Sequence, residues 1–193
     1  STNVRTGKIR VFTGDEIAAD VLLASACLPT LFRAVELHDR RTGQREAFWD
    51  GGYTGNPALF PLYAPTLPND IVVVNINPLV RHDLPRTAEE IDDRINEISF
   101  NAALLGELRS VNFVRELIAE GRMQADRMKD VYVHLIADDR LMNELTAETK
   151  SSASPALIAR LKEAGRKAAA RFLAKHGDTL NVTGSVDLKA LFG

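Results

Sequence analysis

The sequence lacks the features typical of disulfide-bonded, membrane-spanning and nucleic-acid-binding proteins. It has one cysteine in 193 residues, which excludes an internal disulfide and is typical of a reducing compartment. It has no run of 18 apolar residues, so no transmembrane helix is predicted. Its 24 basic residues are scattered among 26 acidic ones, and this balance indicates no nucleic-acid partner. We therefore expect a cytoplasmic protein and leave peripheral association with membranes open.

The histidines and carboxylates also lack the spacing of metal ligands. The histidines are far apart in the chain, and adjacent carboxylates on a helix point about 100° apart, so neither set converges on an ion. We expect no metal and no cofactor. His134 falls within an apolar segment and is interpreted as a hydrogen-bonded strand residue. Asp138-Asp139 follows that segment, where ligands approach an open parallel sheet, and is kept as a secondary candidate site.

The length of 193 residues predicts a single domain with one core. No linker, repeat or low-complexity segment divides residues 1–193. The first ten residues have the pattern of neither a signal peptide nor a transit peptide. Because the sequence does not begin with methionine, we expect a fragment, a processed product or a trimmed version of a longer protein.

Apolar periodicity predicts alternating strands and helices. Four consecutive apolar residues within 70–80, mostly β-branched and bounded by turn residues, indicate a strand buried on both faces. A second such strand is expected at 130–137, and the segment between them has a capping box at Thr87 and helical apolar spacing. Two strands joined by a long helix imply a parallel pair. The expected class is α/β, with a layered, largely parallel sheet and helices on its faces.

The other expected elements are shorter. An unbroken helix over 91–118 would be about 42 Å long at ~1.5 Å per residue, so we expect a kink in it. We also expect strands at 8–12, 32–37 and 45–49, the last two joined as a hairpin through Gly43. A helix is expected at 13–28, with a Thr13–Glu16 capping box at its start and Pro29 at its end. Another helix is expected at 154–177.

Two stretches of the sequence resemble a known family. FWDGGYTGNP at 48–57 joins an aromatic pair to a carboxylate, two glycines and an Asn-Pro turn. ASACLPTLF at 24–32 precedes it at the end of an expected helix. In this order and spacing they resemble the second half of the patatin-like phospholipase domain, which carries a Ser-Ala-x-x-Pro-x-x-Phe helix end, then Asp-Gly-Gly or Asp-Gly-Ala and a nearby Asn-Pro. The matching residues are Ser25, Ala26, Pro29, Phe32, Asp50, Gly51, Gly52, Asn56 and Pro57.

The resemblance implies ester hydrolysis by a serine–aspartate dyad, as in lipid degradation. Asp50 would be the base that takes the proton of the serine. Gly51 and Gly52 would allow the close approach, because they have no Cβ and can adopt positive φ. Asn56-Pro57 would hold the turn beyond them. Trp49 and its apolar neighbour would desolvate the carboxylate and make it a better base.

The nucleophile that the resemblance requires is missing from these residues. No serine has the flanking glycines of a Gly-x-Ser-x-Gly segment, and many relatives have Asn-Asn-Pro where this chain has Gly55-Asn56-Pro57. We therefore expect the serine and the oxyanion hole in an upstream segment. The partner would be that upstream half, or a second copy covering an open sheet edge, with a lipid or other acyl ester as substrate. Two alternatives stay open: a non-catalytic interaction domain, and an α/β enzyme that pairs Asp50 with another carboxylate.

Overall fold

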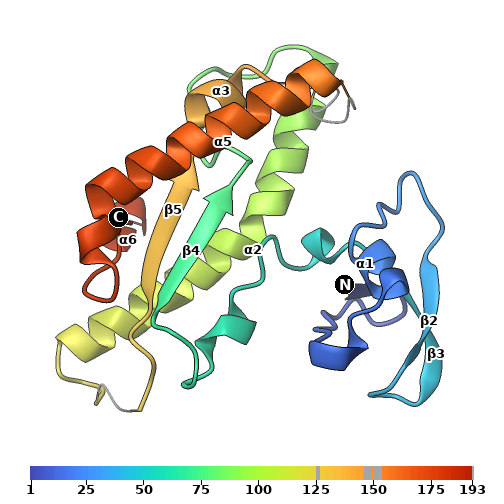
Figure 1. Ribbon diagram of the computed structural model, residues 1–193, viewed down its shortest axis with the longest axis horizontal. Helices are drawn as coiled ribbons and strands as arrows, with labels where there is room; N and C mark the ends of the chain where they lie inside the picture. Colours follow the sequence, from blue (N-terminus) through green and yellow to red (C-terminus); the bar gives the residue numbers. More distant parts are fainter. Residues whose placement is uncertain (125–126, 146–148, 150–153, 193) are drawn as a thin grey trace.

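The computed structural model describes residues 1–124, 127–145, 149 and 154–192. Figure 1 shows short strands and helices together with two long helices. The strands are β1 (Thr2–Asn3), β2 (Val35–Asp39), β3 (Gln44–Trp49), β4 (Asp70–Asn75) and β5 (Tyr132–Ala137). The α-helices are α1 (Ala19–Ser25), α2 (Ala88–Ala119), α3 (Asp139–Asn143), α5 (Pro155–His176) and α6 (Leu188–Phe192), and the 3₁₀ turns are η1 (Gly14–Glu16), η2 (Gly51–Tyr53), η3 (Phe60–Tyr63) and η4 (Gly177–Thr179).

The strands of the described residues form two sheets. One is antiparallel, in the order β1-β3-β2, and the other is the parallel pair β4-β5. The α/β class is confirmed, and α2 connects the two parallel strands as predicted. The expectation of a largely parallel sheet is wrong, because the hairpin and β1 build an antiparallel sheet of their own.

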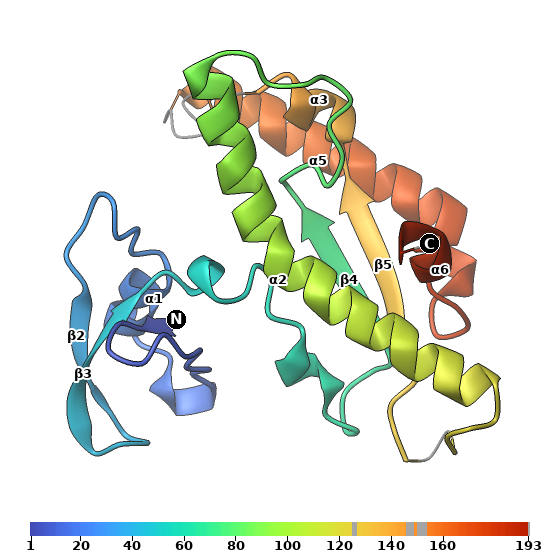
Figure 2. The same cartoon turned by 180° about the vertical axis from the view of Figure 1, so that it is seen from behind.

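The main core lies between α2 and one face of β4 and β5. Leu104 and Leu108 of α2 are fully buried against Ile71, Val73 and Val133 of the strands. Leu104 and Leu108 are four residues apart, so they lie on one side of the helix. Ile71 and Val73 are two residues apart, so they lie on one face of β4, the face toward α2. Figure 2 shows α2 crossing this face of the pair, with its axis bending near the middle.

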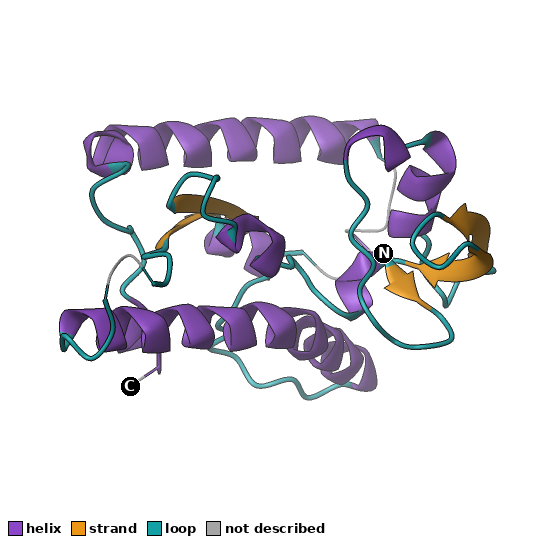
Figure 3. Ribbon diagram, turned by 90° about the horizontal axis from the view of Figure 1, so that it is seen from below, coloured by secondary structure: helices purple, strands orange, loops and turns teal. Residues whose placement is uncertain are grey.

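α5 covers the opposite face of β5, so that β5 lies between two long helices (Figure 3). His134 is fully buried there, with its ring edge-on to Phe172 at 5.7 Å. Its Nε2 lies 2.8 Å from Asp70 Oδ1, and its Nδ1 accepts from the Ser185 main-chain nitrogen at 3.3 Å. The interpretation of His134 as a hydrogen-bonded strand residue is confirmed.

β4 is covered on one face only. Val72 and Val74 are 46% and 68% exposed, and Ile76 just beyond the strand is 64% exposed. The prediction of a strand buried on both faces is therefore wrong for β4, because α5 packs on β5 beside it. Parallel sheets normally have both faces covered by helices, so this bare strip is unusual.

The hairpin and both long helices are confirmed. β2 and β3 pair around Gly43, which takes a φ of 70°. At the start of α2 the Thr87 Oγ1 accepts from Glu90 N at 3.2 Å, and the Glu90 carboxylate accepts from Thr87 N at 3.1 Å. α5 spans Pro155–His176, within the range predicted. No helix in the described part of the chain is long and apolar enough to cross a bilayer.

The expected strand at 8–12 is wrong. Within these residues only Ile9 forms an isolated bridge, with Thr2. The cause is Gly7, whose φ of 65° turns the chain back on itself. The segment before that turn, β1, then pairs with β3 in place of the predicted strand.

The expected helix over 13–28 is broken in two. The capping box at Thr13 is present, but it caps the 3₁₀ turn η1 rather than an α-helix. Gly14 has a φ of 56° and Ile17 is extended, so the helical path is interrupted before α1 begins. α1 ends at Ser25, four residues before Pro29.

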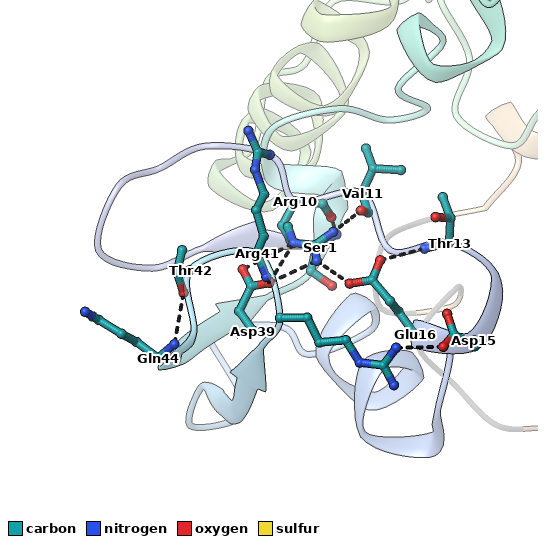
Figure 4. A network of polar contacts seen from close by, with 11 residues as sticks. Ser1, Arg10, Val11, Thr13, Asp15, Glu16, Asp39, Arg41, Thr42 and Gln44 are labelled. Carbon is teal, nitrogen blue, oxygen red and sulfur yellow. Dashed lines mark hydrogen bonds and ion pairs between the residues drawn. The ribbon is translucent and has the colours of Figure 1, made fainter.

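A buried ion cluster ties the N-terminal segment to the hairpin (Figure 4). The Arg10 guanidinium donates to both oxygens of Asp39 at 2.9 to 3.2 Å and pairs with Glu16 at 2.5 Å. Asp39 is 3% exposed. Burial alone would raise the pKa of Asp39, but hydrogen bonds from Arg10 and from the Arg41 main-chain nitrogen hold it below its ordinary value.

This depressed pKa predicts a loss of stability in acid. The carboxylate of Asp39 stabilises the fold above its unfolded pKa of 3.8, and the contribution disappears as the pH falls through the lower pKa of the folded state. Urea midpoints should therefore drop below pH about 4, and the drop should be shallower in Asp39→Asn. Asp15→Asn is the control: Arg40 lowers the pKa of Asp15 as well, but solvent screens this exposed pair, so the slope should change less than in Asp39→Asn. Equal slopes for Asp39→Asn and the native chain would contradict the assignment.

Candidate functional site

Asp50 directly follows β3 and is held at three atoms. Its main-chain nitrogen donates to Cys27 O at 2.8 Å, and its carbonyl accepts from Thr2 Oγ1 at 2.8 Å. Its Oδ1 accepts from the Gly52 main-chain nitrogen at 2.7 Å, which caps η2. The side chain is half-buried, and its Oδ2 accepts no hydrogen bond from the described residues. One carboxylate oxygen is thus fixed while the other remains open to a proton donor.

The two stretches that carry the family resemblance meet in space. The bond between Asp50 and Cys27 joins the end of β3 to the turn after α1. Ser25 closes that helix, with its hydroxyl donating to Leu22 O at 3.0 Å. Pro29 is half-buried, whereas Phe32 is 61% exposed. Cys27 rather than Phe32 is therefore the direct link to Asp50.

Gly51 and Gly52 allow close packing and are not needed for an unusual backbone conformation. Neither has positive φ, although the sequence suggested that freedom as one reason for them. A Cβ on Gly52 would lie 3.0 Å from Phe100 Cε1 and 3.1 Å from Asp50 Oδ1, and one on Gly51 would lie 3.3 Å from the Ser1 nitrogen. The Asp-Gly-Gly loop is thus pressed against α2, a contact that no local sequence signal could indicate.

We expect Gly52→Ala to destabilise the fold by about 1–3 kcal/mol, because Phe100 or the Asp50 carboxylate must move to admit the methyl group. Gly106→Ala is the matched control, since a Cβ there meets nothing within 4 Å in the interior of α2. That change should stabilise the helix by roughly 0.5–1 kcal/mol. Thermal unfolding of both variants measures the difference, and a neutral Gly52→Ala would show that the loop is not tightly packed.

The residues that precede Asp50 are aromatic and at least half-buried. Phe48 is fully buried, with its ring edge-on to Phe12 at 5.5 Å. Trp49 is half-buried, and its indole Nε1 is buried without a partner among the described residues. The predicted turn at Asn56-Pro57 is present, with a cis peptide bond between the two residues.

A cavity of about 310 Å³ lies against the Asp-Gly-Gly loop. Gly51 and Gly55 form one side of it, and the apolar side chains of Val11, Val21 and Leu22 line another. This volume is at the lower end of the range for small-molecule sites. The loop therefore borders an apolar space, although the Asp50 carboxylate itself does not line it.

The other candidate site named from the sequence, Asp138-Asp139, lies at the end of β5. Among the described residues no group of three or more His, Cys, Asp or Glu side chains could hold a metal ion. Asp138 caps α3 through Leu141 N at 3.3 Å and pairs with Arg171 at 3.4 Å, and Asp139 is exposed within that helix. Besides these contacts, Asp138 lines a cavity at the carboxyl end of β5, where the sequence placed the secondary candidate site. Asp50 remains the candidate site.

Two contributors to this site were not found from the sequence. Thr2 binds the Asp50 carbonyl and lies 2.8 Å from the Thr54 hydroxyl, which closes the loop from the other side. Phe100 comes from the middle of α2. Both are about fifty positions away from the loop, so no motif spacing connects them to it.

The chain was compared with protein-family models, with curated proteins and with solved structures, and none of them matches it.

Proposed function

We propose that this chain supplies the general base of an acyl-ester hydrolase of the serine–aspartate type, with Asp50 as that base. The proposal rests on one observation above the others. The Asp50 carboxylate has one oxygen anchored by Gly52 N at 2.7 Å and the other without a protein donor among the described residues. An anchored carboxylate with one open oxygen can receive a proton at a defined position.

The chemistry follows from that geometry and from a serine supplied by a segment outside residues 1–193. Asp50 Oδ2 accepts the hydroxyl proton as the serine oxygen attacks the ester carbonyl. The proton then passes to the leaving alcohol, and an acyl-enzyme remains. Water repeats the sequence with Asp50 as base, which releases the acid and restores the serine. The Gly52 hydrogen bond keeps the carboxylate oriented throughout.

The partner proposed to supply the serine is the upstream half of the same protein, and a second copy is the alternative cover for the open sheet edge. The outer edge of β4 pairs with no strand among the described residues, and open edges readily bind another strand. A segment bound there would complete the parallel sheet and bring its serine to the protein. The substrate class is a lipid or another acyl ester.

Labelling of the longer protein with a fluorophosphonate, followed by peptide mapping, tests the proposal. We expect one labelled serine, in a Gly-x-Ser-x-Gly segment outside residues 1–193, and weaker labelling in Asp50→Asn. Asp15→Asn, at an exposed position, should label like the native protein. Absence of any labelled serine would overturn the proposal.

The second candidate function is a non-catalytic interaction domain. Leu22, Leu31 and Phe32, on either side of Cys27 in the chain, are 60%, 70% and 61% exposed, as the apolar side chains of an interaction surface would be. In that case the hydrogen bond from Gly52 N to Asp50 is only a helix cap. A start codon immediately before Ser1 in the gene would favour this reading, and an upstream Gly-x-Ser-x-Gly frame would oppose it.

A further inference from the structure

A trough runs between the bare face of β4 and the side of α5. It encloses a cavity of about 450 Å³. Val74 and Ile76 form its floor on the strand side, and they are 68% and 64% exposed. The trough lies at the carboxyl ends of the parallel strands, and Asp50 and its loop do not line it. It is therefore a surface distinct from the Asp50 loop, and it includes Asp138, the secondary candidate residue at the end of β5.

The α5 wall of the trough is made of small residues. Gly165 and Ala169 line it together with Ala164 and Ala168. Ile158 and Leu173 are 55% and 57% exposed and extend the same side of the helix, because their spacing from Gly165 and Ala169 is seven and four residues. Small side chains let two helices approach to about 8 Å, and Leu or Ile at the ends then seals the contact.

Positively charged side chains of α5 lie beside this apolar strip. α5 carries six Lys or Arg residues and one acidic residue, Glu163. Three of the cations are paired, namely Arg160 with Glu144, Lys167 with Glu163 and Arg171 with Asp138. Lys162 and Arg166 are exposed, and no ion pair joins them to a carboxylate in the described part of the chain. At four residues apart they project from one side, next to Ala169 and Leu173.

We propose that this trough binds an amphipathic helix with an acidic flank, lying alongside α5 over the bare face of β4. The apolar stripe of the helix would cover Val72, Val74 and Ile76, which completes the second helical layer that parallel sheets normally have. Its acidic flank would face Lys162 and Arg166. Charge complementarity sets the choice of partner, since a basic flank at the same position would be repelled.

Two synthetic peptides test this proposal. The first has 18 residues, about 27 Å as a helix, with a Leu and Ala stripe and glutamates along one flank. The second has lysine in place of every glutamate. Fluorescence anisotropy with the native chain should show the acidic peptide binding at least about tenfold more tightly at low salt, and the difference should shrink at high salt. Lys162→Glu combined with Arg166→Glu should reverse the preference.

Gly165→Glu places a carboxylate inside the trough and should abolish binding of the acidic peptide. A Cβ at Gly165 meets nothing within 4 Å, so α5 should fold normally, which circular dichroism checks. Gly106→Glu is the matched control, at an equally open helical position on α2, and should bind like the native chain. The proposal is overturned by equal binding of both peptides, by binding of neither, or by undiminished binding to Gly165→Glu. It is also overturned if sedimentation shows a dimer that Gly165→Glu dissociates, because a second copy then covers the trough.

Discussion

Asp50→Asn in a protein that contains the proposed serine segment is expected to lower kcat for ester hydrolysis by about 10²–10⁴-fold, because the amide cannot accept the serine proton. The fold should be almost unaffected. The Asn side-chain oxygen can still accept from Gly52 N, and Asn caps helices as well as Asp does. Initial rates with a p-nitrophenyl ester measure the loss, and thermal unfolding verifies the structure.

This result is interpreted by comparing the effect of each substitution on kcat with its effect on stability. If Asp50 is only a structural cap, Asp50→Asn should leave both quantities unchanged, whereas Asp50→Ala should lower stability by roughly 1 kcal/mol. Retention of the native kcat by Asp50→Asn would therefore remove the base from the proposed mechanism. Asp15→Asn, at an exposed site away from the loop, controls for the loss of one negative charge.

Phe48→Ala is expected to cost about 3–5 kcal/mol of unfolding free energy, the largest stability effect predicted for the Asp50 region. Phe48 is fully buried and pairs with Val35 on one side and Asn3 on the other, at the centre of the antiparallel sheet. Truncation would leave a cavity facing Phe12 and free the end of β3, from which Asp50 projects. Hydrolysis should therefore fall together with stability.

Urea unfolding of the two phenylalanine variants measures this effect. Phe113→Ala removes the same group from a side chain that is 60% exposed on α2, and it should change stability by no more than about 0.5 kcal/mol. A cost below about 1 kcal/mol for Phe48→Ala would mean that the sheet repacks around the gap and does not position Asp50.

Local signals in the sequence predicted the elements whose formation depends on neighbouring residues. The hairpin follows from strand-forming residues around Gly43, and the start of α2 follows from the Thr87 capping box. The parallel pairing of β4 and β5 follows from the long helix between them. Where the local signal was ambiguous, as at Thr13, the same capping pattern produced a 3₁₀ turn, because the next glycine took a positive φ.

The candidate site was only partly predictable for the same reason. Asp50 and the glycines stand out as a motif, and the resemblance supplies the expected role of each. The contacts that hold them do not follow from any pattern, because Thr2, Cys27 and Phe100 come from three other segments of the chain. Which of these segments would meet the loop depends on how the two sheets and α2 pack together.

The sequence by itself determined the α/β class, the boundaries of the long helices and the identity of the one carboxylate in the motif, because each depends on residue type and short-range spacing. Only the tertiary structure decided that Gly52 is needed for contact with Phe100, that β1 replaces the strand predicted at 8–12, and that β4 has one bare face. These depend on which surfaces face each other, and the free energy of burying a surface is set by its partner rather than by its own sequence.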